Sequence, residues 1–364
     1  MKILLMGGTG VLGAALGPFL SSNHINSVDV TSRKKRNGHD NLNYIQGDAK
    51  ELNFIIPLIQ KENYDVIVDF MLYSVNEFKE RINLLLSNTK HYIFISSSRV
   101  YAESKHPLTE DSSRLLDITN DSEYLKDFEY SLYKAKEEDI LNNTTKKNWS
   151  IIRPYKTYNE DRMQLGVFEK EQFADRVIRG KKIVFLKDCI DKYTSLTHNT
   201  DVAKVLSEIA QRAPSGKIYQ IASPQRKTWN EILNIYVSAF NSQGFNFEYV
   251  LTNDYKSVAK IFHNRYRMKY DGFLNRFFSD CSIQKEFGPF NWIPLEKGLT
   301  ESVAKYIDER KHRIEQIDYT HEAFFDRITK EREPISSIKG IKNKIKYIFF
   351  RYFPQKIVFS LRSE

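Results

Sequence analysis

The sequence of 364 residues predicts an α/β fold built on a doubly wound parallel sheet. Two observations predict this fold class. Short apolar runs alternate with helical patterns through the first 150 residues, as they do in βαβ units. Several of these runs are almost continuously apolar, which is typical of parallel strands that helices cover on both faces.

Six strands are expected in this region. They are expected at residues 2–7, 27–33, 42–48, 64–72, 91–98 and 149–154. The segment TGVLGAALGPFLSS, after the first strand, has the pattern of a helix that packs behind it. We therefore expect one domain over residues 1–154, to which later segments can return.

The pattern changes after residue 154, where loops rich in charge and Tyr begin. We expect a smaller, mainly substrate-binding region over residues 155–310. Residues 311–364 are predicted to form a charged, partly helical extension that ends in a basic amphipathic tail.

Composition narrows the classes of function. Two cysteines, Cys189 and Cys281, are too few for a disulfide framework and lack metal-ligand spacing, so we expect no metal site and a reducing cytoplasm. No stretch reaches the ~20 apolar residues of a membrane span, and no signal peptide is expected. The net charge is +9, but residues 339–364 hold seven Lys or Arg and one Glu, which is +6, and leave +3 for the rest. Nucleic acid is therefore not an expected partner of the main domain.

Three glycines follow the first strand, in the run GGTGVLG. Glycines let a backbone approach a pyrophosphate closely, and the start of the next helix offers unpaired N–H groups to an anion. The spacing departs from G-x-G-x-x-G, so a tight turn without a ligand is the alternative. The place of this turn in the βαβ series favours a phosphate site. The expected cofactor contacts are Gly7, Gly10, Val11, Leu12 and Gly13.

The end of the second strand bears on the choice between NAD and NADP. Asp29 lies inside the strand pattern, too early for the carboxylate that normally binds the ribose. Ser32 and Arg33 occupy the strand end, and a small hydroxyl beside an Arg fits a 2′-phosphate, which favours NADP. A solvated basic loop is the alternative. Asp48, after the third strand, is a candidate acceptor for an adenine amino group, or a cap of the next helix.

The run FEYSLYKAKEEDIL, residues 128–141, suggests the chemistry. Tyr130 and Lys134 are four apart and therefore share one helix face. A cation held beside a phenol favours the phenolate, so Tyr130 is a candidate acid or base for a sugar hydroxyl while a hydride moves to or from a nicotinamide. Lys134 is also a candidate ligand of the nicotinamide ribose. The run ISSSRVY, residues 95–101, supplies hydroxyls at the end of the fifth strand.

With these motifs the chain resembles an extended short-chain dehydrogenase/reductase of the NAD-dependent epimerase/dehydratase family, over residues 1–310. GGTGVLG is similar to the family's glycine motif, QGDAK to its adenine-side Asp, ISSSRVYA to its Ser-Ser-x-x-Val-Tyr-Gly strand end and YSLYKAKEE to its Tyr-x-x-x-Lys helix. IIRPYKTY, GKIYQIAS and DCSIQKEFG resemble further family segments. The resemblance implies a Rossmann-type domain that binds NAD(P) and a smaller domain that holds a nucleoside-diphosphate sugar. It implies Ser97, Tyr130 and Lys134 as catalytic residues, with Pro154 beside the nicotinamide.

Departures from the family pattern bear on the reaction. Ser98 and Arg99 occupy positions where 4,6-dehydratases carry Asp and Glu, so dehydration would lack its acid and base. Both residues are instead candidates for contact with the substrate. Met71 and Leu72 replace small residues after the fourth strand. Met71 is therefore expected to narrow the nicotinamide side.

The substrate side departs as well. Thr194 stands where the family often carries an Arg that binds the diphosphate. Arg162 and Lys192 are candidates to replace that Arg. Tyr155, in the Arg-Pro segment, is a further candidate contact with the substrate.

The expected reaction is epimerisation. Tyr130 takes a proton from a sugar hydroxyl while the hydride passes to the nicotinamide, and Ser97 shares the hydrogen bond. Return of the hydride to the other face of the keto sugar gives an epimer, whereas reduction of a different keto sugar by NADPH is the alternative. The basic strand end at Ser32 and Arg33 favours that alternative because it suits exchangeable NADP. A non-catalytic cofactor sensor or RNA-binding protein of the same fold is a third alternative, usually marked by loss of Tyr-x-x-x-Lys.

The tail, residues 335–364, has the pattern of a basic amphipathic helix. Its apolar stripe consists of Ile338, Ile341, Ile345, Ile348 and Tyr352. Its lysines on the remaining surface are Lys339, Lys342 and Lys346. Pro354 is expected to end the helix. Such a helix can lie in the headgroup region of an anionic membrane, beside glycosyltransferases that build surface polysaccharide, or dock on the protein's own core or on a second subunit of a homodimer.

Overall fold

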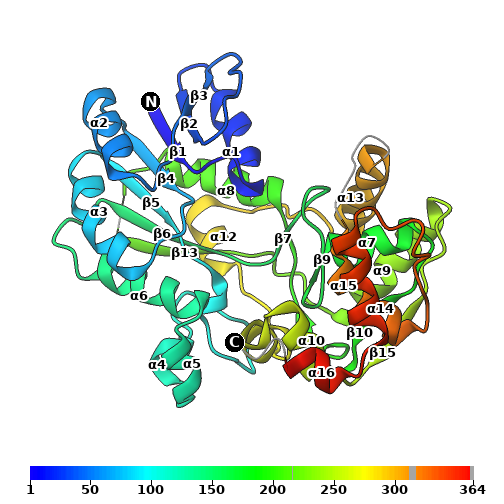
Figure 1. Ribbon diagram of the computed structural model, residues 1–364. Coiled ribbons are helices and arrows are strands. Elements are labelled where there is room, and N and C mark those ends of the chain that lie inside the picture. Colours follow the sequence, from blue (N-terminus) through cyan, green and yellow to red (C-terminus); the bar gives the residue numbers. More distant parts are fainter. Residues whose placement is uncertain (215, 311–316, 361–364) are drawn as a thin grey trace. The chain divides into compact units, whose positions relative to one another are not determined.

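The computed structural model describes residues 1–214, 216–310 and 317–360, which fold into two compact units (Figure 1). The first unit comprises Met1–Thr157, Ser195–Gln225 and Phe277–Ile293, and the second comprises the described residues of Tyr158–Thr194, Arg226–Arg276 and Pro294–Glu364. Two segments of the range expected to bind substrate therefore return to the first unit. Of the expected extension and tail, residues 311–316 and 361–364 lie outside the described residues.

A seven-stranded parallel sheet forms the centre of the first unit. Its strands, in chain order, are β1 (Lys2–Met6), β2 (Ser27–Ser32), β3 (Leu42–Gln46), β4 (Val66–Asp69), β5 (His91–Ile95), β6 (Trp149–Pro154) and β13 (Lys217–Ile221). They lie in the order β13-β6-β5-β4-β1-β2-β3, and each neighbouring pair is parallel. This arrangement confirms the predicted α/β, Rossmann-type fold and its six strands, and it adds β13 at one edge.

The strand order reverses beside β1. The chain runs from β1 through β2 to β3, then crosses back to β4 on the other side of β1. Ile3 accordingly pairs with Val28 of β2 on one side and with Val66 of β4 on the other. Open parallel sheets bind ligands at the carboxyl ends of the strands that flank such a reversal. A ligand is therefore expected at the loops that follow Met6 and Asp69.

Helices cover both faces of the sheet (Figure 1). One face carries α1 (Val11–Ser21), α8 (Asn199–Ala210) and α12 (Cys281–Phe287), and the other carries α2 (Leu52–Glu62), α3 (Val75–Ser87) and α6 (Tyr130–Asn142). Alternate side chains of β1 pack into the hydrophobic clusters on the two faces of the sheet. Ile3 and Leu5 pack with α1 and α8, whereas Leu4 and Met6 pack with α2 and α3. Each such side chain, fully buried, stabilises the fold by about 2 kcal/mol.

Shorter elements complete the first unit. They are a 3₁₀ helix (Ser98–Val100), α4 (Leu115–Ile118), α5 (Ser122–Asp127) and β12 (Thr197–His198), and β7 (Thr157–Tyr158) spans the unit boundary. Phe128, between α5 and α6, has a φ of +50° and ends α5. The turn at Phe128 allows α6 to begin two residues later, at Tyr130.

The second unit is mainly helical. Its helices are α7 (Lys170–Ile178), α9 (Trp229–Ser242), α10 (Tyr255–Phe262), α11 (Arg265–Arg267), α13 (Leu295–Arg310), α14 (Tyr319–Thr329), α15 (Ile341–Tyr352) and α16 (Gln355–Ser360), with a π turn at Met268–Gly272 and a 3₁₀ turn at Lys187–Cys189. Its strand pairs are β8 (Gln164–Leu165) with β9 (Phe168–Glu169), β10 (Ile183–Leu186) with β15 (Tyr249–Thr252), and β11 (Tyr193–Thr194) with β14 (Lys227–Thr228). α15 ends before Pro354, which confirms the expected helix end.

Within the described ranges, none of the helices combines the length and the apolar character that a membrane crossing requires.

Candidate active site

The glycine turn joins β1 to α1 and leaves little room for side chains. Gly7 has a φ of +66°, in the region that favours glycine, and its N–H donates to Oγ1 of Thr31 at 2.8 Å. A Cβ on Gly13 would lie 2.4 Å from the carbonyl oxygen of Gly8, so the close packing of turn and helix requires glycine there. A Cβ on Gly10, in contrast, would meet no heavy atom of the described chain within 4 Å. Gly10 therefore faces open space.

The open space at Gly10 fits a pyrophosphate. Gly10 is the N-cap of α1, and among the described residues no side chain caps this helix end and no acidic residue stands in its first turn. The N–H groups and the dipole of a helix N-terminus attract an anion. Val11 and Leu12, the first two helical residues, are partly exposed. The residues present thus suit the phosphates of a dinucleotide.

The end of β2 presents a cation instead of a carboxylate. Asp29 is buried, and its carboxylate accepts a hydrogen bond from the Tyr64 hydroxyl at 2.7 Å, so this side chain is engaged inside the core. Ser32 is also buried, and its hydroxyl donates to the carbonyl of Lys34 at 2.7 Å. Arg33 is exposed. The hydroxyl of Ser32 is thus engaged within the turn, and contact of Arg33 with a 2′-phosphate stays a prediction.

Asp48 and Met71 lie after β3 and β4. Oδ1 of Asp48 accepts the N–H of Lys50 at 2.9 Å, just before α2. The alternative expected for Asp48, a cap of the next helix, is not found, because the N-cap of α2 is Glu51 and no described side chain hydrogen-bonds to that helix end. The contact of Asp48 with adenine stays a prediction. The sulfur of Met71 would lie 2.5 Å from a Cβ on Gly7, so Met71 packs against the glycine turn. Met71 therefore borders the expected cofactor site.

Tyr130 and Lys134 lie one turn apart in α6, as their spacing predicts. Tyr130 begins the helix and is partly exposed, and the guanidinium carbon of Arg99 lies 5.3 Å from its ring centroid. Arg99 also pairs with Glu129, the N-cap of α6, at 2.5 Å. Lys134 is 2% exposed, and its ammonium lies over the ring of Phe94 at 4.5 Å from the centroid. The phenol at the helix start thus has one cation against its ring and a second one turn along.

Two neighbouring serines follow β5 and differ in role. Ser97 is 8% exposed, and its hydroxyl accepts the N–H of Arg99 at 3.2 Å. Ser98 is fully buried, and its hydroxyl donates to the carbonyl of Arg153 in β6 at 2.8 Å. This placement corrects the expectation that Ser98 contacts the substrate, because its hydroxyl fastens the 3₁₀ helix to β6 inside the core. Ser97 remains the candidate hydroxyl.

A buried acidic network surrounds the ammonium of Lys134. Oε2 of Glu137 lies 3.0 Å from Nζ of Lys134, and Asp69, at the end of β4, accepts hydrogen bonds from Tyr92 at 2.8 Å and from Tyr73 at 3.1 Å. Burial raises the pKa of Glu137 to about 7, against the attraction of Lys134, and burial also raises the pKa of Asp69. Neither Glu137 nor Asp69 is a candidate on sequence grounds, although Glu137 follows Lys134 at a helical spacing of three.

Comparison with known proteins identifies the family of this chain. The model of the NAD dependent epimerase/dehydratase family matches residues 3–222, which is more than half of the chain. The chain belongs to the NAD-dependent epimerase/dehydratase family. A search of the curated proteins found no match.

Solved structures of the same fold include nucleotide-sugar enzymes. The chain is similar to dTDP-glucose 4,6-dehydratase from Bacillus anthracis in complex with NAD, with 19% identity and a TM-score of 0.63 over 85% of this chain and 98% of that chain. It is similar to UDP-glucuronic acid 4-epimerase from Bacillus cereus in complex with NAD, with 14% identity and a TM-score of 0.62 over 85% and 97%. It is also similar to the Bordetella bronchiseptica enzyme WbmH in complex with NAD⁺, with 15% identity and a TM-score of 0.63 over 85% and 98%. At these identities the likeness is one of fold.

The Arg-Pro segment of this family member lies at the end of β6. Pro154 closes the strand and is partly exposed. Tyr155 is 1% exposed, and its ring packs against Phe278 with centroids 4.7 Å apart. This burial corrects the expectation that Tyr155 contacts the substrate, because its side chain belongs to the core.

The candidate diphosphate contacts belong to the second unit. Arg162 is partly exposed beside a turn in which its N–H bonds to Oδ1 of Asn159 at 3.1 Å. Lys192 is also partly exposed, and Thr194 is buried. Because these residues lie in a different unit from Tyr130, their contact with a substrate stays a prediction.

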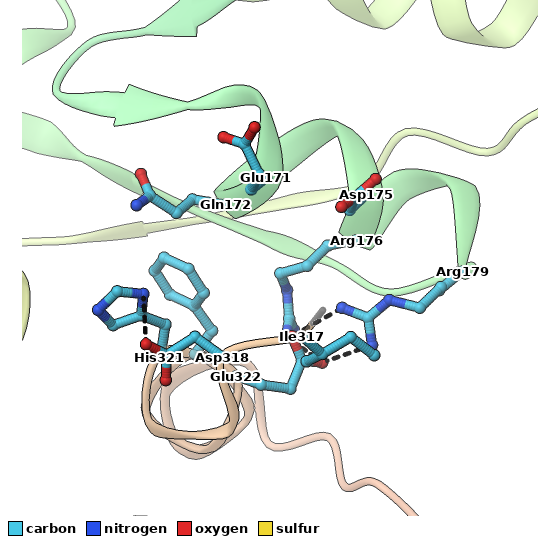
Figure 2. Close-up of a pocket in the computed structure, with 10 residues that line it drawn as sticks. Glu171, Gln172, Asp175, Arg176, Arg179, Ile317, Asp318, His321 and Glu322 are labelled. Carbon is cyan, nitrogen blue, oxygen red and sulfur yellow. Dashed lines mark hydrogen bonds and ion pairs between the residues drawn. The ribbon is translucent and has the colours of Figure 1, made fainter. Parts of the chain in front are cut away.

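A pocket of about 290 Å³ lies within the second unit, between α7 and α14 (Figure 2). Several of its charged side chains pair with one another. Arg179 donates two hydrogen bonds to Glu322, at 3.0 and 2.7 Å, and His321 lies 3.8 Å from Asp318. None of the predicted site residues lines this pocket, and its paired charges join α14 to α7.

Three carboxylates beside this pocket have the spacing of a cation site. Glu322, Asp326 and Glu333 bring their oxygens within 4.8 Å of one another. Nζ of Lys181 lies 2.8 Å from Glu322, 2.8 Å from Asp326 and 2.7 Å from Glu333. The ammonium of Lys181 thus supplies the positive charge that these carboxylates need, and the cluster is a buried ion-pair network.

Proposed function

We propose that the protein is an NAD(P)-dependent epimerase that acts on a nucleoside-diphosphate sugar through a keto intermediate. The observation that carries this proposal is the grouping of Tyr130, Lys134 and Ser97 in the same unit as the glycine turn. The turn follows β1 and Ser97 follows β5, and only β4 separates these two parallel strands, so both loops leave the same edge of the sheet. Membership of the family supports the choice of cofactor and of substrate class.

The reaction follows from the chemistry of the three side chains. Tyr130, as the phenolate, accepts the proton of a sugar hydroxyl while the hydride leaves the carbon that bears it, which produces a ketone. Ser97 donates a hydrogen bond to the same oxygen, and the charge of Lys134 stabilises the phenolate. Bound NAD(P) supplies the acceptor and later the donor of the hydride. Return of the proton from Tyr130, with hydride addition to the opposite face, gives the epimer.

Epimerisation is favoured over dehydration by the residues after Ser97. Dehydration requires an acid and a base beside the keto sugar, and the family's dehydratases carry Asp and Glu at the positions of Ser98 and Arg99. Here the hydroxyl of Ser98 is buried against β6, and Arg99 is a permanent cation paired with Glu129. Neither side chain supplies a carboxyl group for loss of water.

The proposal extends to the substrate and its use. UDP-glucuronic acid and dTDP-glucose, the substrates named for two of the solved relatives, are the first compounds to test. Arg162 and Lys192 are proposed to bind the diphosphate. We place the reaction in the cytoplasm, where its product would serve glycosyltransferases that build surface polysaccharide.

A second candidate function rests on the end of β2. Exposed Arg33, with Lys34, Lys35 and Arg36 after it, suits NADP, which exchanges readily in reductases. An NADPH-dependent reductase of a keto sugar would use the same Tyr130 and Lys134. Consumption of NADPH with a keto sugar, without interconversion of two epimers, would favour this second function.

Conversion of UDP- and dTDP-sugars into their epimers, followed by chromatography of the sugar products, tests the proposal. Tyr130→Phe removes the phenol and keeps the ring, so turnover should fall by about 10²–10⁴-fold. Tyr133→Phe is the matched control, because Tyr133 lies on the same helix with its ring packed against Phe128. Epimerisation that survives Tyr130→Phe, or that falls equally with Tyr133→Phe, would contradict the proposed mechanism.

A further inference from the structure

One face of α15 is fixed to the second unit. Tyr347 is fully buried, its hydroxyl donates to Oδ2 of Asp326 at 2.6 Å, and the N–H of Glu333 donates to that hydroxyl at 2.5 Å. Arg351 donates through Nε and Nη2 to the carbonyl of Glu331, at 3.1 and 2.9 Å. Since Asp326 lies on α14, these bonds hold α15 against that helix.

α14 is itself held firmly within the second unit. Arg176 of α7 lies 2.7 Å from Glu322 and 3.0 Å from Asp326, and Lys181 reaches both carboxylates. Burial alone would raise the pKa of Glu322, but the charges of Arg176, Arg179 and Lys181 lower it to about 2. These ion pairs give α15 a fixed support, so its outer face keeps a defined direction relative to the second unit.

The outer face of α15 is apolar and exposed. Four side chains at steps of four, three and four residues form it, and their exposed fractions are 75% for Ile341, 62% for Ile345, 38% for Ile348 and 56% for Tyr352. Exposed Phe353 and Ile357 continue the apolar surface toward α16. Of the predicted stripe, only Ile338 is buried. The helix therefore docks on its own unit through Tyr347, and most of the stripe stays exposed.

Lysines border this apolar face. On a helix of 100° per residue, Lys342 and Lys344 fall on opposite sides of the line from Ile341 to Ile345 and Ile348. Lys346 and, beyond the helix, Lys339 and Lys356 are exposed as well. Residues 335–360 contain no Asp or Glu. The surface therefore combines apolar side chains with lysines, and the segment carries no acidic side chain of its own.

We infer that the outer face of α15 binds the headgroup region of an anionic membrane and holds the protein at the membrane surface. An interfacial helix lies in the plane of the membrane with its apolar face in the acyl boundary and its cations among the headgroups. Each Lys near an anionic surface strengthens such binding. A second copy on the same face would bring the lysine borders of two chains together, because a two-fold contact pairs identical surfaces.

Flotation of the full chain with vesicles tests this inference. Binding should be strong to vesicles of phosphatidylcholine with phosphatidylserine and at least about tenfold weaker to phosphatidylcholine alone, given the number of lysines involved. Ile341→Ser with Ile345→Ser should weaken binding by at least about tenfold. Both side chains are exposed, so the fold is retained. Ile25→Ser is the matched control, because Ile25 is 81% exposed on the first unit.

A charge test separates lipid binding from self-association. Lys342→Glu with Lys346→Glu should abolish the preference for phosphatidylserine and leave the oligomeric state unchanged. Two results would overturn the inference. One is equal flotation of the native chain and the Ile341→Ser, Ile345→Ser variant. The other is an oligomer that this variant dissociates, with no binding of the native chain to either vesicle.

Discussion

Nζ of Lys134 lies 3.0 Å from Oε2 of Glu137, inside the first unit and one turn from the phenol of Tyr130. Both side chains are almost completely buried. The electrostatic surroundings of the ammonium that we propose to stabilise the phenolate of Tyr130 therefore depend on the protonation of a neighbouring carboxyl group. Burial raises the pKa of Glu137 to about 7, so this group changes charge near neutral pH.

Glu137→Gln should change how stability depends on pH. The pKa of a Glu in the unfolded chain is 4.5, so between about pH 5 and pH 7 the unfolded chain loses a proton that the folded chain keeps. The native protein therefore loses stability as the pH rises through this window, whereas Gln cannot ionise. The free energy of unfolding of the variant, minus that of the native protein, should rise by roughly 3 kcal/mol at most between pH 5 and 8.

Urea unfolding of both proteins at several pH values measures this difference. Asp69 is retained in both proteins, and its repulsion of Glu137 is part of the effect that the comparison measures. A difference that stays constant from pH 5 to pH 8 would show that Glu137 titrates at its ordinary pKa.

Two alanine variants of the glycine turn should behave differently. Gly13→Ala places a Cβ 2.4 Å from the carbonyl oxygen of Gly8, and overpacking of this kind costs about 1–3 kcal/mol of stability. Gly10→Ala meets no atom of the described chain and keeps the melting temperature, but its Cβ enters the space proposed for the pyrophosphate. Dinucleotide affinity of the Gly10 variant should fall by at least about tenfold in calorimetric titration. Unchanged affinity would place the phosphates elsewhere.

Arg33→Ala should distinguish the two dinucleotides. Arg33 is exposed at the end of β2, and a hydrogen bond to a charged group contributes about 1.5–3 kcal/mol. The affinity for NADP should therefore fall by about tenfold or more, while the affinity for NAD stays within about twofold. Lys61→Ala, an exposed cation on α2, is the control. Equal effects on both dinucleotides would remove the preference for NADP.

Glu138→Gln should destabilise the first unit strongly. Arg153 donates to Glu138 through Nε at 2.9 Å and through Nη2 at 2.7 Å, and both side chains are buried, so this ion pair joins α6 to β6. Removing one charge leaves the other buried without its partner, at a cost of about 3–5 kcal/mol. Guanidinium unfolding should show this loss. The double variant Arg153→Met, Glu138→Leu should lose clearly less stability than Glu138→Gln. An equal loss of stability would show that packing, not charge, dominates.

The parts of the fold that the sequence predicts are those set by local pattern. The six strands follow from apolar runs, and the turn at Gly7 follows from glycines at the end of the first run. The pairing of Tyr130 and Lys134 on one face follows from a spacing of four. Each depends on residues near one another in the chain, so no knowledge of distant contacts is needed.

The errors concern contacts between distant segments. Ser98 and Tyr155 belong to motifs that suggest a site, yet their burial depends on packing against Arg153 and Phe278. The carboxylate of Asp69 is held by Tyr92, which is distant in sequence and adjacent only in the sheet. In the tail, the periodicity of the apolar stripe does not reveal that the buried side is the one with Tyr347.

Mass spectrometry of the small molecules released from freshly purified, denatured protein tests whether the chain holds a nicotinamide dinucleotide. We expect NAD or NADP to be released in an amount close to that of the protein or, where none is retained, to bind to the protein in titration. A protein that releases neither dinucleotide and binds neither in titration would contradict the claim that Gly10 and the start of α1 hold the cofactor of a sugar epimerase.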